Sequence, residues 1–113
     1  MKIIIESIKE QRYDTLGDWF YENGDLHVRV SSIIGGRFEV YLIAIHELIE
    51  AILCERAGIT PQQVDEFDLN YNGIEREPGD DMNCPYRRQH RFAMLIEHLV
   101  AHELGMVEYG KVE

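Results

Sequence analysis

The feature that most constrains the fold is a change in hydrophobic period near residue 36. Upstream, Asp18–Ser31 alternates apolar and polar side chains on both sides of the dipeptide Asn23-Gly24. Alternation at period two is typical of strands with one buried face, and Asn-Gly supplies the two positive-φ positions of a type I′ turn. Downstream, apolar residues recur at helical spacing from Arg37 to Ala57, and Gly58 is suited to end a helix. The sequence therefore predicts a β-hairpin followed by a long helix.

The remaining elements are predicted from local signals. Lys2–Ile8 is expected to form a strand, and its run Ile3–Ile5 is too apolar for one buried face alone. The sequence TPQQ at Thr60–Gln63 combines an N-cap residue, a proline at the first helical position and a glutamine at the third, which indicates a short capped helix. A final long helix is expected to start with Pro85 and to end before Gly105.

Together these elements predict one α+β domain that spans residues 1–113. We expect a small antiparallel sheet, made of the N-terminal strand and the hairpin, packed on two long helices and one short helix. Capping and solubility account for most of the acids Asp65, Asp68, Asp80 and Asp81. The segment Glu75–Cys84 is acidic and rich in turn residues, so we expect a loop. It lacks the regular alternation of a calcium-binding EF-hand loop.

Charge and composition limit the classes of partner. The chain carries a formal charge of −10, which opposes binding to a phosphate backbone, so nucleic acid is not an expected partner. No apolar run approaches the roughly 20 residues that cross a bilayer, and the N-terminus lacks the pattern of a signal peptide. We therefore expect no membrane contact and a cytoplasmic location, where Cys54 and Cys84 would be free thiols.

A histidine and two glutamates interrupt the apolar run of the first long helix, in the stretch IAIHELIEAIL. His46 and Glu50 are four residues apart, so both side chains leave the same face of a helix and can bind one metal ion. Glu47 lies beside them, where a carboxylate can accept a proton from water bound to that ion. Two interpretations are open: these residues form the solvated face of an amphipathic helix, or they hold an ion.

The final helix offers a matching pair of groups. His90 and Glu97 lie two turns apart on one face, among small apolar residues. Buried carboxylates are rare unless they are paired or bind metal. We therefore predict that His46, Glu50, His90 and Glu97 converge as a metal site between the two long helices. The alternative is a structural His–Glu hydrogen bond without an ion.

The segment His46-Glu47-x-x-Glu50 resembles the HExxH helix of the zincin metallopeptidases. The resemblance covers residues 46–50 and their surroundings, a small sheet before the helix and a later helix that can supply a third ligand. It implies a zincin-like fold, a ligand role for His46 and a general-base role for Glu47, with Glu50 in the place of the second histidine. Because this replaces a neutral ligand by an anion, manganese or iron joins zinc as an expected ion.

The block from His46 to Gly105 also looks like small proteins of unknown function carried by bacteriophages and prophages, which agrees with an accessory role in the cytoplasm.

Three functions are compatible with these residues, and whether the chain is an enzyme stays open. The first is a metal-binding protein that acts as a hydrolase or peptidase, with an extended peptide substrate added to the strand edge Asp25–Ser31. The second is a non-enzymatic acidic interaction module with structural His–Glu pairs. The third is a nucleotide pyrophosphatase similar to the all-helical MazG type, in which Glu47 and Glu50 would bind Mg²⁺. An exposed sheet edge would also suit a homodimer.

Overall fold

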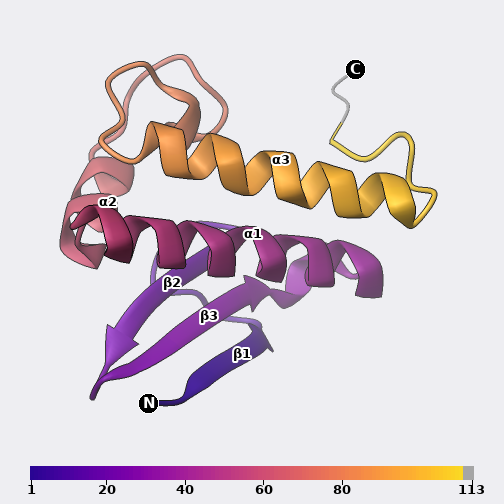
Figure 1. The fold of residues 1–113 in the computed structure, drawn as a ribbon, viewed down its shortest axis with the longest axis horizontal. Helices are drawn as coiled ribbons and strands as arrows, with labels where there is room; N and C mark the ends of the chain where they lie inside the picture. Colours follow the sequence, from indigo (N-terminus) through magenta and orange to yellow (C-terminus); the bar gives the residue numbers. More distant parts are fainter. Residues whose placement is uncertain (111–113) are drawn as a thin grey trace.

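The computed structural model describes residues 1–110, and its main elements form three layers (Figure 1). A three-stranded sheet is one layer, helix α1 (Arg37–Ala57) lies across it, and helix α3 (Arg87–Glu103) lies on the other side of α1. The short helix α2 (Pro61–Leu69) and the loop that follows it lie at one end of the molecule. The predicted α+β class is confirmed. The three strands do not agree with the all-helical architecture of the third candidate function.

The sheet is mixed rather than wholly antiparallel. Strands β2 (Gly17–Glu22) and β3 (Asp25–Ser31) form the predicted hairpin, with φ values of 53° at Asn23 and 80° at Gly24. Strand β1 (Ile3–Ile8) pairs with β3 in parallel, which gives the strand order β1-β3-β2. The end of β1 and the start of β2 flank the same end of β3. The loop of residues 9–16 therefore has to cross only two strand spacings, about 10 Å, which is well within its reach.

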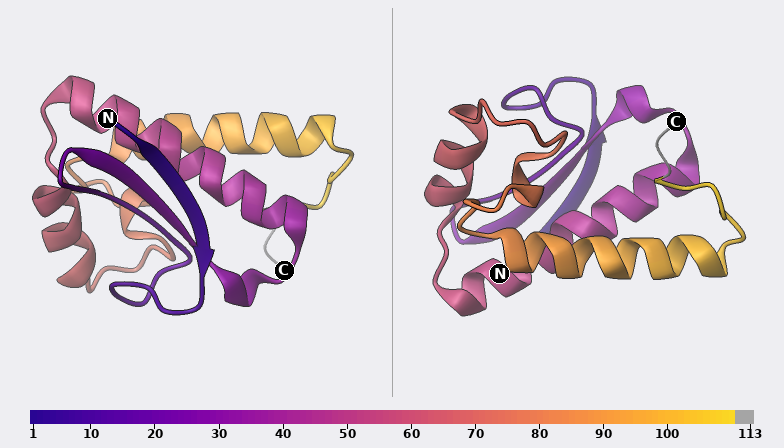
Figure 2. Two further views of the ribbon diagram at one scale, coloured as in Figure 1. Left: turned by 90° about the horizontal axis from the view of Figure 1, so that it is seen from below. Right: turned by 90° about the horizontal axis from the view of Figure 1, so that it is seen from above.

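This strand order corrects two expectations. Because β3 is the central strand, its two edges are already paired, and the prediction that Asp25–Ser31 accepts an added peptide strand was wrong. The expected burial of both faces of β1 is also wrong, since Ile3 and Ile5 are 57% and 51% exposed and, within Ile3–Ile5, only Ile4, on the opposite face, is half-buried. Helix α1 packs on β2 and β3, and the left view of Figure 2 shows the sheet in front of this helix.

The helices follow their local signals closely. Gly58 caps α1 in the left-handed conformation, and Thr60 and Gln63 complete a capping box at the start of α2. Helix α3 begins at Arg87 rather than at Pro85. The amide of Cys84 bonds to the carbonyl of Asp81, and the amide of Arg87 bonds to the carbonyl of Cys84, so the chain is still turning at Pro85.

The middle position of α1 explains its sequence. A helix covered on two sides needs apolar residues on both, which is why apolar residues occur on the sheet side and on the α3 side of α1. The main core lies between the sheet, α1 and α2, and residues from the segment just before α3 complete it. Its members are Trp19, Leu26, Val28, Ala51, Cys54, Val64, Cys84 and Tyr86. Within residues 1–110, no helix combines the length and the apolar character needed to cross a membrane.

Candidate metal centre

His46 and Glu50 are buried in the interface between α1 and α3. Only 6% of His46 and 4% of Glu50 is exposed, so they are not the solvated face that one interpretation of the sequence required. His90 comes from α3, is 5% exposed, and meets them from the opposite helix. The two long helices lie side by side along this stretch (Figure 1). Buried residues of this kind need partners, because an unpaired polar group costs several kcal/mol to desolvate.

Three side-chain atoms of these residues form a nearly equilateral triangle. The Nε2 atom of His46 lies 3.2 Å from Oε2 of Glu50 and 3.2 Å from Nδ1 of His90, and the third side, from His90 Nδ1 to Glu50 Oε2, is 3.1 Å. Ligands bound tetrahedrally at about 2.0–2.1 Å from one ion are roughly 3.3 Å apart. These histidine and glutamate groups are therefore close enough to hold a metal ion.

Two further residues fix the orientation of this triangle. Oε1 of Glu97 lies 2.7 Å from Nδ1 of His46, so the ring can donate its Nδ1 proton there and keep Nε2 for the triangle. The indole N–H of Trp19 donates to Oε1 of Glu50 at 3.0 Å and leaves Oε2 for the same point. Tyr109 donates in turn to the other oxygen of Glu97. Such outer hydrogen bonds set the tautomer and the direction of metal-binding side chains.

The electrostatics of the cluster reflect this close packing. Burial alone would lower the pKa of His46, but the hydrogen bonds with Glu50 and Glu97 outweigh it and raise the pKa to about 11. The pKa of His90 is raised to about 9 because the nearby carboxylates of Glu50 and Glu77 outweigh the effect of its burial. Burial would raise the pKa of Glu50, but the two imidazoles lower it to about 2. Without an ion, these pKa values favour protonated imidazoles beside an ionised Glu50.

Glu47 lies at the edge of the triangle. Its Oε2 atom is 3.9 Å from Nε2 of His46, and its side chain is 12% exposed. Burial, with the charge of Glu50 added, raises the pKa of Glu47 well above its ordinary value. Gly17 leaves room for this side chain, since a Cβ atom there would lie 2.9 Å from Cγ of Glu47. The carboxyl is near enough to act on a water molecule held at the triangle.

The four predicted ligand residues are thus brought together, in two roles. His46, Glu50 and His90 contribute the triangle, whereas Glu97 lies behind the His46 ring, on its other nitrogen. Sequence reasoning missed Trp19, although a buried tryptophan usually needs a partner for its N–H, and this could have pointed to Glu50.

The loop before α3 was also underestimated. Glu77 and Asp80 each place a carboxylate oxygen 3.5 Å from Nε2 of His90. Neither residue was predicted to face a histidine, and Asp80 was expected to serve capping or solubility. Between them, Gly79 lies flat against the His90 ring, and a Cβ atom at this position would be 2.4 Å from Cγ of the imidazole. No periodic pattern marks such loop contacts, so they could not be predicted from local sequence.

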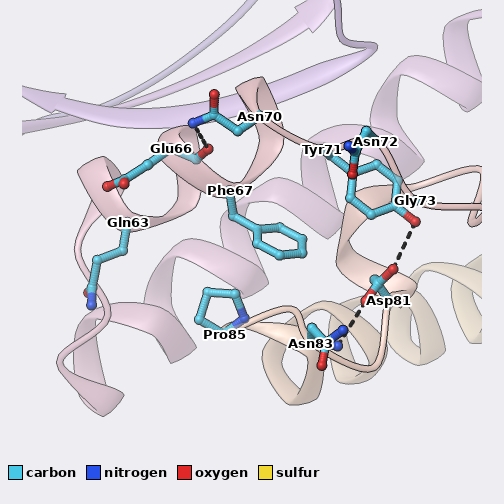
Figure 3. Close-up of a pocket in the computed structure, with 10 residues that line it drawn as sticks. All are labelled: Gln63, Glu66, Phe67, Asn70, Tyr71, Asn72, Gly73, Asp81, Asn83 and Pro85. Carbon is cyan, nitrogen blue, oxygen red and sulfur yellow. Dashed lines mark hydrogen bonds between the residues drawn. The ribbon is translucent and has the colours of Figure 1, made fainter.

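A cavity lies apart from the triangle. It has a volume of about 560 Å³ and is lined by α2, the residues that follow it and the segment next to Pro85 (Figure 3). Phe67 points into it, and Tyr71 donates a hydrogen bond to Asp81 at its rim. None of the residues of the triangle lines this cavity.

No family model, no curated protein and no solved structure matches this chain. The function therefore has to be argued from the geometry of the site.

Proposed function

We propose that this protein binds a zinc ion through Nε2 of His46, Oε2 of Glu50 and Nδ1 of His90. The observation that carries the proposal is the triangle of three buried ligand atoms with sides of 3.1–3.2 Å. Two histidines and one glutamate are a donor set of catalytic zinc sites, which keep a fourth position for water or substrate. Manganese and iron are the alternatives, because they also accept imidazole and carboxylate ligands.

We further propose that the bound ion serves hydrolysis, as the likeness of His46-Glu47-x-x-Glu50 to the zincin helix suggests. A bound zinc ion supplies Lewis acidity, which makes a water molecule near it acidic. Glu47 would accept a proton from that water, since its carboxyl lies within 3.9 Å of a ligand atom and is not itself part of the triangle. Glu97 and Trp19 would keep His46 and Glu50 aimed at the ion.

Metal analysis of the purified protein tests the first proposal. We expect about one zinc ion per chain after dialysis against zinc and removal of the excess. The His46→Ala and His90→Ala variants should lose it, whereas His98→Ala, which removes an exposed histidine of α3, should retain it. Native protein without bound metal, or both variants with full occupancy, would contradict zinc binding.

The catalytic proposal is tested by Glu47→Gln, which keeps the shape of the side chain and removes its basicity. The zinc-loaded native protein should cleave at least one member of a panel of fluorogenic peptides and esters. The variant should bind zinc equally well and lose roughly 100-fold or more in kcat, the usual contribution of a general base. A variant with native activity would remove the assignment of Glu47, and an inactive native protein would leave only metal binding.

The non-enzymatic alternative has one observation in its favour. Both nitrogens of His46 already have carboxylate partners, so hydrogen bonds alone can satisfy this residue. An interaction module of this kind would purify without metal, and its melting temperature would be the same with zinc and with EDTA.

A further inference from the structure

We infer that the same centre holds a second divalent cation, bound by Nε2 of His90, Oε2 of Glu77 and Oδ1 of Asp80. The inference extends the proposed zinc site, because His90 would belong to both. Its Nδ1 atom takes part in the triangle with His46 and Glu50, and its Nε2 atom points away from that triangle toward the loop before α3.

The first argument is that Nε2 of His90 is buried without a partner. The residue is 5% exposed, and among residues 1–110 this nitrogen has no hydrogen-bond partner. A buried polar atom without a hydrogen-bond partner is rare, because leaving it unpaired lowers the stability of the fold. The carboxylates of Glu77 and Asp80 are each 3.5 Å from it, which is too long for a hydrogen bond.

The second argument is that the spacing suits an ion. The three ligand atoms lie within 4.8 Å of one another. Nitrogen and oxygen ligands about 2.1 Å from one ion are roughly 3.0–3.4 Å apart, so the two distances of 3.5 Å need only small side-chain adjustments.

The loop holds both carboxylates against the ring. Residues Pro78–Asp80 form a 3-10 turn in which the amide of Asp80 bonds to the carbonyl of Glu77. Arg87 of α3 donates to the carbonyl of Asp80, which ties the turn to the helix that carries His90. The Gly79 backbone packs on the imidazole itself. The arrangement is therefore fixed by the backbone as well as by the side chains.

The second site differs from the first in exposure and in chemistry. The side chains of Glu77 and Asp80 are 53% and 25% exposed, so an ion there would be open to solvent and to a substrate. One nitrogen and two carboxylates form a harder ligand set than that of the triangle, which favours Mn²⁺ over softer ions. With both ions bound, His90 would bridge them as an imidazolate, after its last ring proton is released to solvent.

A stepwise titration tests the inference. Protein loaded with one equivalent of zinc is titrated with Mn²⁺, and free Mn²⁺ is followed by its electron paramagnetic resonance signal. We expect about one Mn²⁺ bound per chain. The double variant Glu77→Gln/Asp80→Asn should weaken Mn²⁺ binding at least tenfold and retain the zinc. The matched control Glu75→Gln removes an exposed carboxylate of the same loop and should bind Mn²⁺ like the native protein.

Each other result has a distinct meaning. Native protein that binds no Mn²⁺ at millimolar concentration, or a double variant that binds it unchanged, would overturn the second site. A double variant that only lowers zinc affinity would also overturn it, since Glu77 and Asp80 would then merely orient His90. Protein that takes up no zinc but binds one Mn²⁺ in a way sensitive to the double variant would contradict the zinc proposal and support the Glu77–Asp80–His90 site.

Discussion

At the scale of single residues, the two ring nitrogens of each buried histidine have different surroundings. The Nε2 atom of His46 belongs to the triangle, and its Nδ1 atom faces Glu97. In His90, the Nδ1 atom belongs to the triangle, and the Nε2 atom faces the two loop carboxylates. An imidazole held at both nitrogens has a fixed tautomer and a fixed ring plane. The orientation of the triangle therefore depends on residues that lie outside it.

Gly79 is the clearest of these residues, and we predict that Gly79→Ala weakens metal binding. The added Cβ would lie 2.4 Å from Cγ and 2.5 Å from Nδ1 of His90, and the buried ring cannot move away freely. Zinc affinity, measured by competition with a chelator, should fall at least tenfold. As a control, Gly36→Ala meets only the flexible end of Glu39 and should leave the affinity unchanged. Native affinity in Gly79→Ala would show that the loop does not position His90.

The residues of the site were predictable from sequence only in part. Helical spacing placed His46 with Glu50 and His90 with Glu97, and the rarity of buried carboxylates brought the two pairs together. Spacing could not show that Glu97 faces the far nitrogen of His46, because that depends on the rotation of each helix. The contacts of Trp19, Glu77 and Asp80 depend on long-range packing, for which no local pattern exists.

At the scale of elements, small buried residues control how closely α1 and α3 approach. Ala93 and Ala101 of α3 are fully or almost fully buried. Ala93 lies one turn from His90 on the same face of α3, and the imidazole rings of His46 and His90 are 4.8 Å apart between their centroids. Larger residues at these positions would push the helices apart.

We predict that Ala93→Leu destabilises the protein and separates the two histidines. Inserting a larger side chain into a packed interface typically costs about 1–3 kcal/mol, which urea denaturation of the metal-free protein would measure. Zinc affinity should fall as well, because the triangle needs ligand atoms from both helices. The control Arg88→Leu places the same side chain at an exposed position of α3 and should change the stability by less than about 0.5 kcal/mol. Equal effects of the two variants would contradict this role of Ala93.

Elements with strong local signals were predicted correctly, and those that depend on distant partners were not. The Asn23-Gly24 hairpin, the Thr60 capping box and the Gly58 cap are all read from a few neighbouring residues. The parallel pairing of β1 with β3 joins segments far apart in the chain, and nothing in Ile3–Ile8 itself selects that partner.

At the scale of the whole molecule, the metal-free protein should lose stability in alkaline solution. The pKa values of His46 and His90 are about 11 and about 9 in the fold, against an ordinary value of 6.5. A group whose pKa is raised by folding contributes stability that is complete below its unfolded pKa and is lost as the pH rises through the folded value. Glu47 adds to this loss, because its pKa is also raised by folding and its contribution to stability falls once the pH exceeds the ordinary value of 4.5.

Glu50 determines how the stability of the metal-free protein changes in acid. Its pKa is lowered from 4.5 to about 2, so its contribution is present above the first value and is lost as the pH falls toward the second. The cluster should therefore stabilise the metal-free protein most between about pH 4.5 and 6.5, the ordinary values of Glu50 and the two histidines.

A bound ion should change this profile, because zinc replaces protons on the imidazoles. Binding is opposed by protons at low pH and becomes more favourable as the pH rises, so the ion stabilises the fold most where the metal-free cluster stabilises it least. We predict that the difference in melting temperature between zinc-loaded and EDTA-treated protein increases steadily from pH 6 to pH 9. His46→Ala should show no such difference at any pH. A native difference that is constant over this range would mean that zinc binds without displacing protons from His46 and His90, and would place the ion elsewhere.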